Sequence, residues 1–142
     1  MEKNESLLIK IVATMIGIAL VVVAYFLISE LAGAKYDGEI TIELKDENGE
    51  LLEERKINFN DGDKLDQLLI DTFGDELEYE TSDMYGMNIN KIGDLTTTYA
   101  DTYMIYIAIY QNGEYANFGV SFLPFEDGDV ITFKLERYDY EW

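Results

Sequence analysis

An uncharged segment near the N-terminus, residues 11–29, constrains this chain more than any other feature of its sequence. It reads IVATMIGIALVVVAYFLIS, and at about 1.5 Å of helical rise per residue it approaches the roughly 30 Å thickness of the hydrocarbon core of a bilayer. A helix that is apolar on every side has no polar face to present to water, which argues against a core helix of a soluble domain. We therefore expect a single transmembrane helix in which residues 11–29 cross the membrane.

Two fates of this segment stay open, because a signal peptidase site follows it. Ala32 and Ala34 occupy the small-residue positions of an A-x-A-like site, which predicts cleavage after Ala34. The apolar run is longer than the about 7 to 15 residues of a usual signal peptide core, and few basic residues precede it. The sequence therefore favours an uncleaved signal anchor over a secretory signal.

Both fates place the rest of the chain outside the cytoplasm. Lys3 and Lys10 precede the apolar run, which weakly favours a cytoplasmic N-terminus. We expect a single-pass protein of the cell membrane, or a secreted protein if the chain is cleaved after Ala34. The expected organisation is an anchor or signal segment in residues 1–34 and one extracytoplasmic domain in residues 35–142.

Composition excludes several classes of function. The chain has neither Cys nor His, so it offers no thiol nucleophile, no Ser-His-Asp triad and no ordinary zinc site. No segment fits the twelve-residue calcium loop of an EF-hand. Residues 35–142 hold 26 acidic and 8 basic residues, and a net charge of -19 for the whole chain repels a phosphate backbone. We expect no enzyme, no catalytic residue, no metal site, no required cofactor and no nucleic-acid partner.

The first half of the domain has the pattern of a hairpin followed by a helix. Residues 39–45 alternate polar and apolar side chains, which predicts a strand, and Asn48-Gly49 favours a tight turn into a return strand over residues 51–59. Residues 60–63 predict a turn and a helix N-cap, and residues 64–73 a helix. The side chains expected to face the core are Ile40, Ile42, Leu44, Leu52, Ile57 and Phe59 of the strands and Leu65, Leu68, Leu69 and Phe73 of the helix.

The second half consists of further strands. Residues 75–101 predict short strands separated by turns, and residues 103–110 a central strand that is apolar on both faces. Asn112-Gly113 turns the chain back, and residues 127–129 turn it into a last strand over 130–136, with Ile131, Phe133 and Leu135 on one face. The predicted fold class is α+β, a β-grasp-like mixed sheet with one packed helix, preceded by the transmembrane helix.

The segment from Tyr103 to Phe133 resembles the signature of the transcobalamin C-terminal-like domain family, a β-grasp family of bacterial surface proteins. The family pattern is an aromatic strand, an Asn-Gly-Glu turn, a Gly shortly after it, and an Asp-Gly-Asp turn before the closing strand. The hairpin and helix between Ile40 and Phe73 fit the opening half of the family. The matching positions are Tyr103, Tyr106, Asn112-Gly113-Glu114-Tyr115-Ala116, Gly119, Leu123 and Asp127-Gly128-Asp129-Val130.

The resemblance implies a module that binds a ligand, with cobalamin-like corrinoids as the first candidate and uptake by a transporter as the context. Aromatic side chains can stack on a flat ligand, and Asn side chains can donate and accept hydrogen bonds. The rival hypothesis is a cell-surface module that docks another envelope protein and binds no small ligand. The candidate binding residues are Tyr103, Tyr106, Tyr115 and Phe118 for apolar contact and Asn112 and Asn117 for hydrogen bonds.

Overall fold

A computed structural model of the chain describes residues 2–31, 33–34 and 36–141, and it divides into two units, residues 1–31 and 32–142. The first unit is one helix, α1 (Glu2–Leu31). Its stretch Asn4–Ile28 is long and apolar enough to cross a membrane, and its side chains are exposed, as they are in an anchor or in a signal sequence. Ala32 of the expected cleavage site lies outside the described residues.

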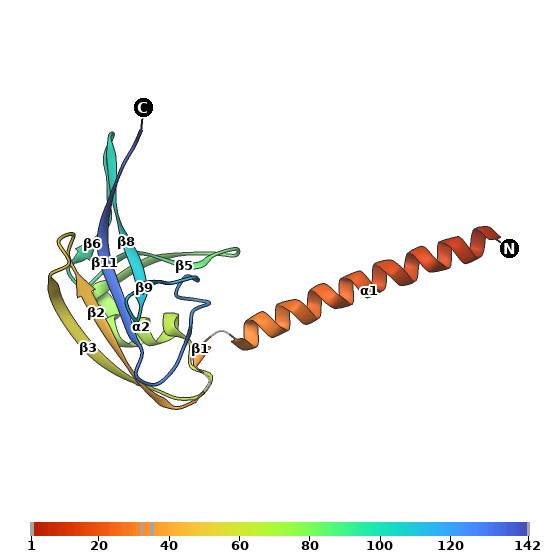
Figure 1. Cartoon of the computed structure of the whole chain (residues 1–142), viewed down its shortest axis with the longest axis horizontal. Coiled ribbons are helices and arrows are strands. Elements are labelled where there is room, and N and C mark those ends of the chain that lie inside the picture. Colours follow the sequence, from red (N-terminus) through yellow and green to blue (C-terminus); the bar gives the residue numbers. More distant parts are fainter. Residues whose placement is uncertain (1, 32, 35, 142) are drawn as a thin grey trace. The chain divides into compact units, whose positions relative to one another are not determined.

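The second unit consists of short and long strands around one helix (Figure 1). Its elements in chain order are β1 (Gly33–Ala34), β2 (Gly38–Lys45), β3 (Leu51–Phe59), α2 (Leu65–Phe73), the 3-10 turn η1 (Gly74–Glu76), β4 (Leu77–Ser82), β5 (Gly86–Ile92), β6 (Leu95–Thr96), β7 (Thr98–Tyr99), β8 (Tyr103–Gln111), β9 (Glu114–Tyr115), β10 (Pro124–Phe125) and β11 (Val130–Asp139).

The main sheet has the strand order β3-β2-β11-β8-β7, with β9 also paired to β8. The first and last long strands, β2 and β11, are parallel neighbours, and the other pairs in this sheet are antiparallel. A second sheet, β4-β5-β6, and the short parallel pair β1-β10 complete the unit. The predicted α+β class, a β-grasp-like mixed sheet with one packed helix after a long apolar helix, is confirmed.

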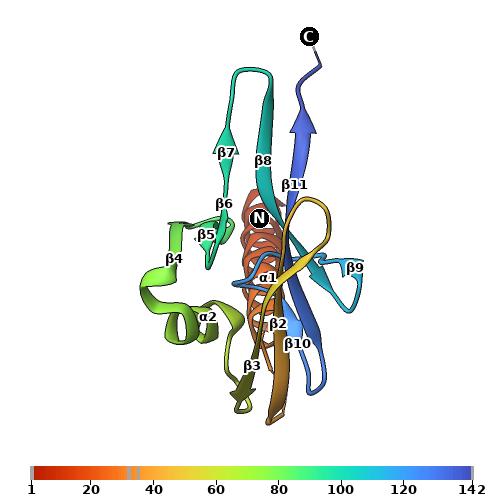
Figure 2. The same cartoon turned by 90° about the vertical axis from the view of Figure 1, so that its left-hand side faces the viewer.

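Helix α2 covers one face of the main sheet, together with β4 and β5 (Figure 2). Its apolar stripe is buried as the helical spacing predicts, in Leu65, Leu68, Leu69 and Phe73. The guanidinium of Arg55 lies 4.2 Å from the centre of the Phe73 ring and donates a hydrogen bond to the carbonyl of Thr72. These contacts fix the helix on the sheet, and the alternating residues Ile40, Ile42, Leu44, Ile131 and Phe133 form the buried surface beneath.

The expectation that Leu52 faces the core is wrong. Side chains alternate along β3, so Ile57 and Phe59 share the buried face and Leu52 points to the other one, where it is 47% exposed. Leu52 and Ile57 lie five positions apart, and an odd separation in a strand puts two side chains on opposite faces.

The expected N-cap of the helix needs correction, and the β2–β3 turn forms where it is expected, with its own local geometry. The N-cap of helix α2 is Lys64, whose side chain has no acceptor and makes no cap hydrogen bond. The carboxylate of Asp63 instead accepts the N–H of Asn60 in the preceding turn. In the β2–β3 turn, Asn48 does not adopt a positive φ, and only Gly49 does, at 80°. The carboxylate of Asp46 accepts the N–H groups of both Asn48 and Glu50, which produces a longer turn than a two-residue hairpin.

We predict that Ile42→Ala lowers the free energy of unfolding by about 2–5 kcal/mol, because Ile42 is fully buried between the sheet and α2. Leu52→Ala in the neighbouring strand should change it by no more than about 0.5 kcal/mol, since that side chain is exposed. Chemical denaturation of the full chain in detergent micelles, followed by circular dichroism, measures both. Equal losses for the two variants would contradict the assignment of the buried face.

Candidate functional site

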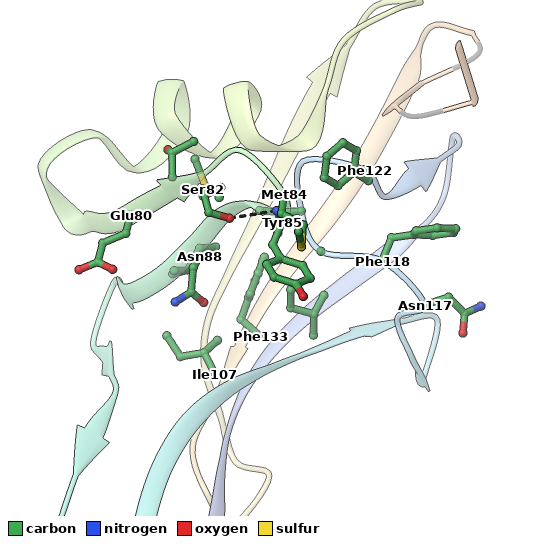
Figure 3. A pocket seen from close by; sticks show the side chains of 16 residues that line it. Glu80, Ser82, Met84, Tyr85, Asn88, Ile107, Asn117, Phe118, Phe122 and Phe133 are labelled. Atoms are coloured by element: carbon green, nitrogen blue, oxygen red, sulfur yellow. Dashed lines mark hydrogen bonds between the residues drawn. The ribbon is translucent and has the colours of Figure 1, made fainter. Parts of the chain in front are cut away.

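A pocket of about 670 Å³ opens between the β4–β5 hairpin, strand β8 and the loop of residues 117–122 (Figure 3). This volume lies within the range of small-molecule sites, about 300–1,000 Å³. Most of its lining is apolar or aromatic, with polar side chains at its ends. The lining residues are Glu80, Thr81, Ser82, Met84, Tyr85, Met87, Asn88, Ile89, Ile107, Ile109, Asn117, Phe118, Gly119, Val120, Phe122 and Phe133.

The floor of the pocket belongs to the hydrophobic core. Phe133 of β11 and Val120 are buried, and Ile107 and Ile109 of β8 pack against the same core. The rim carries large exposed side chains instead. Tyr85 is 73% exposed and Phe118 51% exposed, and Figure 3 shows Tyr85 between Glu80 on one side and Phe118 on the other.

A chain of hydrogen bonds holds the hairpin against the loop. The N–H of Met87 donates to Oγ of Ser121 at 2.9 Å, and this hydroxyl donates to Oδ2 of Asp66 in α2 at 3.0 Å. Gly86 has a φ of 70°, and a Cβ added there would lie 2.5 Å from Cβ of Ser121. Glycine is thus required both for the backbone conformation and for the close approach of the hairpin to the loop.

The structure brings only two of the six candidate residues, Asn117 and Phe118, to this pocket. Tyr103 is the first residue of β8 and does not line the pocket. The guanidinium carbon of Arg137 lies 3.9 Å from the centre of the Tyr103 ring. Asn112 lies in the β8–β9 turn, where its side chain is committed to structure: it donates to Asp129 at 2.9 Å and accepts the N–H of Val130 at 2.9 Å.

Tyr106 and Tyr115 lie on the other face of the main sheet, where with Tyr110 they surround Glu136. The alternation of β8 explains this, because Ile107 and Ile109 face the pocket and the positions between and beside them face away. All three phenol hydroxyls donate to the Glu136 carboxylate, that of Tyr106 at 3.2 Å. We name this group, Tyr106, Tyr110, Tyr115 and Glu136, the tyrosine cluster.

Ionisation in the tyrosine cluster follows from these hydrogen bonds. Burial disfavours the charged carboxylate of Glu136, but the hydrogen bonds from Tyr110, Tyr115 and Tyr106 outweigh burial and lower its pKa. Burial and the nearby carboxylate raise the pKa of Tyr106, and the hydrogen bonds to Glu136 raise the pKa values of Tyr110 and Tyr115. The cluster therefore stabilises one protonation pattern, a carboxylate with three neutral phenols.

Sequence reasoning missed most of the pocket. The strand pattern of residues 103–110 and the short strands expected in residues 75–101 do not single out Ile107, Ile109, Met84 or Met87 as lining residues. The alternation in residues 103–111 indicates that Ile107 and Ile109 lie on one face of the strand and Tyr106 and Tyr110 on the other. It does not indicate which of the two faces packs against another element.

We predict that Glu136→Gln lowers the free energy of unfolding by about 1–2 kcal/mol at neutral pH, because three phenols lose a charged acceptor. The lowered pKa of Glu136 means that this stabilisation is present above the ordinary carboxyl pKa of about 4.3 and is lost as the pH falls through the lower folded-state value. Chemical denaturation across this pH range measures the difference between the variant and the wild type.

Glu114→Gln, an exposed change in neighbouring β9, is the control for the loss of one negative charge. Titration of the tyrosine side chains, followed by the ultraviolet absorbance of tyrosinate, is a second measurement on the same cluster. Phenols that ionise above their ordinary pKa of about 10 in the wild type should ionise at lower pH in Glu136→Gln. A Glu136→Gln variant that matches Glu114→Gln in both measurements would contradict the stabilising role of the cluster.

Solved structures share this fold. One is described as a "putative metal binding protein" from Ruminococcus gnavus ATCC 29149, with a TM-score of 0.54 and 20% sequence identity over 71% of this chain and 98% of that chain. Another is haptocorrin in complex with Cbi, with a TM-score of 0.54 and 15% identity over 71% of this chain and 26% of the haptocorrin chain. This chain thus spans about a quarter of haptocorrin, and the likeness in both cases is one of fold.

No curated protein matches the sequence. Among the described residues, no group of three or more Asp or Glu side chains could hold a metal ion. The similarity to haptocorrin is a similarity of fold, and it agrees with the expected transcobalamin-like β-grasp fold. A family model matches residues 62–137, more than half of the 142 residues, and the chain accordingly belongs to the family described as Domain of unknown function (DUF4430).

Proposed function

We propose that this protein is a membrane-anchored, extracytoplasmic binding module whose pocket holds an apolar or aromatic-faced small molecule, with corrinoids as the first candidate. The observation that carries the proposal is the construction of the pocket. An apolar floor formed by Ile107, Ile109 and Phe133 lies beneath a rim that includes Tyr85 and Phe118. The site requires no cofactor, and the proposal assigns it binding without catalysis.

The chemistry of the lining suits a flat ligand with polar edges. Aromatic side chains contribute large contact areas and stack on planar groups, and a few polar groups are enough to orient a ligand in such a site. Asn88 and Asn117 provide amide donors and acceptors at different parts of the lining. Haptocorrin, solved with Cbi, has the same fold in one part of its chain, which supports a corrinoid as the first ligand to test.

The apolar helix supports the proposed location. Helix α1 is long and apolar enough to span a bilayer, and anchoring would keep the domain beside a transporter that takes up the ligand. In this proposal residues 1–34 form the anchor and residues 35–142 the binding domain. Cleavage after Ala34 would release residues 35–142 as a secreted protein without β1, the short strand that pairs with β10.

A second candidate function is docking of an envelope protein, which the exposed rim favours. Met84, Tyr85, Phe118 and Phe122 together expose a group of large apolar side chains around one opening, and such groups mark protein contacts as well as ligand sites. The two functions differ in what fills the pocket: a ligand reaches the floor at Ile107 and Phe133, whereas a docked protein needs only the rim.

We predict that the full chain in detergent micelles retains cobinamide or cobalamin in equilibrium dialysis, and that Phe118→Ala weakens binding about fivefold or more. The expected loss corresponds to about 1 kcal/mol for one aromatic contact. Tyr106→Ala is the matched control, because Tyr106 lies on the opposite face of the sheet and should leave the affinity unchanged. Circular dichroism establishes that both variants are folded.

Two outcomes would contradict this assignment. Loss of binding in Tyr106→Ala with normal binding in Phe118→Ala would place the site on the tyrosine cluster instead. Absence of retention up to millimolar corrinoid would remove corrinoids as ligands, and capture of an envelope protein that depends on Phe118 would then favour docking.

We predict that the protein isolated from membranes begins at its original N-terminus and resists extraction by alkaline carbonate, because residues 11–29 are long enough to span the bilayer. Intact-mass measurement and N-terminal sequencing read the outcome. A mature chain that begins at Lys35 in the soluble fraction would establish the secretory alternative. Replacement of Ala32, the other small residue of the expected site, by a bulky residue is the control, since it blocks cleavage without shortening the apolar run and leaves the buried Ala34 in place.

A further inference from the structure

The lining of the pocket has an unbalanced charge. Among the described residues that line it there is one carboxylate, Glu80, and no Lys or Arg. An anionic ligand that entered it would lose water without gaining a counter-charge, which is costly in a partly apolar site. A cationic ligand would meet a carboxylate. The composition of this lining therefore favours a cationic over an anionic ligand.

The carboxylate stands at a defined place in the site. Glu80 of β4 pairs in register with Asn88 of β5, and Figure 3 shows the two side chains together at the end of the pocket away from Phe118. Tyr85 lies between Glu80 and Phe118. A ligand that stacks on the aromatic rim can thus extend a charged group toward Glu80 and Asn88.

Two further features favour positive charge. The faces of Tyr85, Phe118 and Phe122 carry the negative part of the ring quadrupole, which attracts cations in addition to offering apolar contact. Residues 35–142 hold 26 acidic and 8 basic residues, and this excess attracts cations within about 8 Å of the surface at physiological salt.

We propose that the pocket selects a ligand that carries a positive charge on an apolar or aromatic body, with Glu80 as the residue that recognises the charge. The inference rests on the proposed function, because it names the class of ligand for the same pocket. It assigns the aromatic rim to the body of the ligand and the Glu80–Asn88 end to the charged group.

Two water-soluble probes that share one benzyl group test this selectivity. Benzyltrimethylammonium is a cation, and phenylmethanesulfonate is an anion of similar size. Titration of each into the full chain in zwitterionic micelles at physiological salt, followed by saturation-transfer NMR with empty micelles as a blank, gives both affinities. We expect the cation to bind at least tenfold more tightly, and Glu80→Gln to weaken its binding threefold or more.

Glu54→Gln is the matched control, because it removes the same charge from an exposed position of β3 outside the pocket lining. It should leave the preference for the cation unchanged. Phe118→Ala should weaken binding of the cation, because Phe118 lines the pocket, and this result would show that the probe occupies it. Cobinamide retention, measured on the same sample, reports separately on the proposed function.

Several results would overturn the charge selectivity and leave the proposed function in place. These are equal affinity for the two probes, tighter binding of the sulfonate, a cation affinity that Glu80→Gln leaves unchanged, or retention of cobinamide without binding of either probe. Failure of both probes and of the corrinoids would overturn the proposed function and the charge selectivity together.

Discussion

The parallel pairing of β2 with β11 is the interaction on which the rest of the domain depends. It places Ile42 beside Ile131 and Leu44 beside Phe133, so residues about ninety positions apart form one buried surface. Helix α2 needs that surface to cover its apolar stripe, and β8 needs β11 as its partner. Because β8 and β11 also provide the floor of the pocket, the site exists only when the two ends of the domain have met.

The pocket lies between the β4–β5 hairpin of the second sheet and strand β8 of the main sheet. The β4–β5 hairpin is held on one side by Ser121, whose hydroxyl joins the backbone of Met87 to Asp66 of α2. Gly86 permits this approach, since a side chain there would collide with Ser121. The hairpin tip then stands over the main sheet with Tyr85 exposed, and the space beneath it is the pocket.

The two faces of the main sheet have separate roles. On one face, Ile107 and Ile109 join the core and the pocket floor. On the other, Tyr106 and Tyr110 donate to Glu136, and a carboxylate with three phenol donors stabilises the outer surface of β8, β9 and β11. Three of the four aromatic candidates from the sequence are therefore engaged in structure: Tyr103 with Arg137, and Tyr106 and Tyr115 with Glu136. The proposed site depends on the β4–β5 hairpin and the loop of residues 117–122.

Features that depend on neighbours along the chain can be predicted from the amino-acid sequence. The apolar helix, the positions of the long strands, the buried stripe of α2 and the excess of negative charge all follow from local spacing and composition. Alternation in β8 also separates two sets of side chains. The tertiary structure is needed to show which set meets the core, and that Phe118 and Tyr85 line one pocket while Tyr106 donates to Glu136. A local period fixes which side chains share a face, whereas contact between faces is set by pairing between strands far apart in the chain.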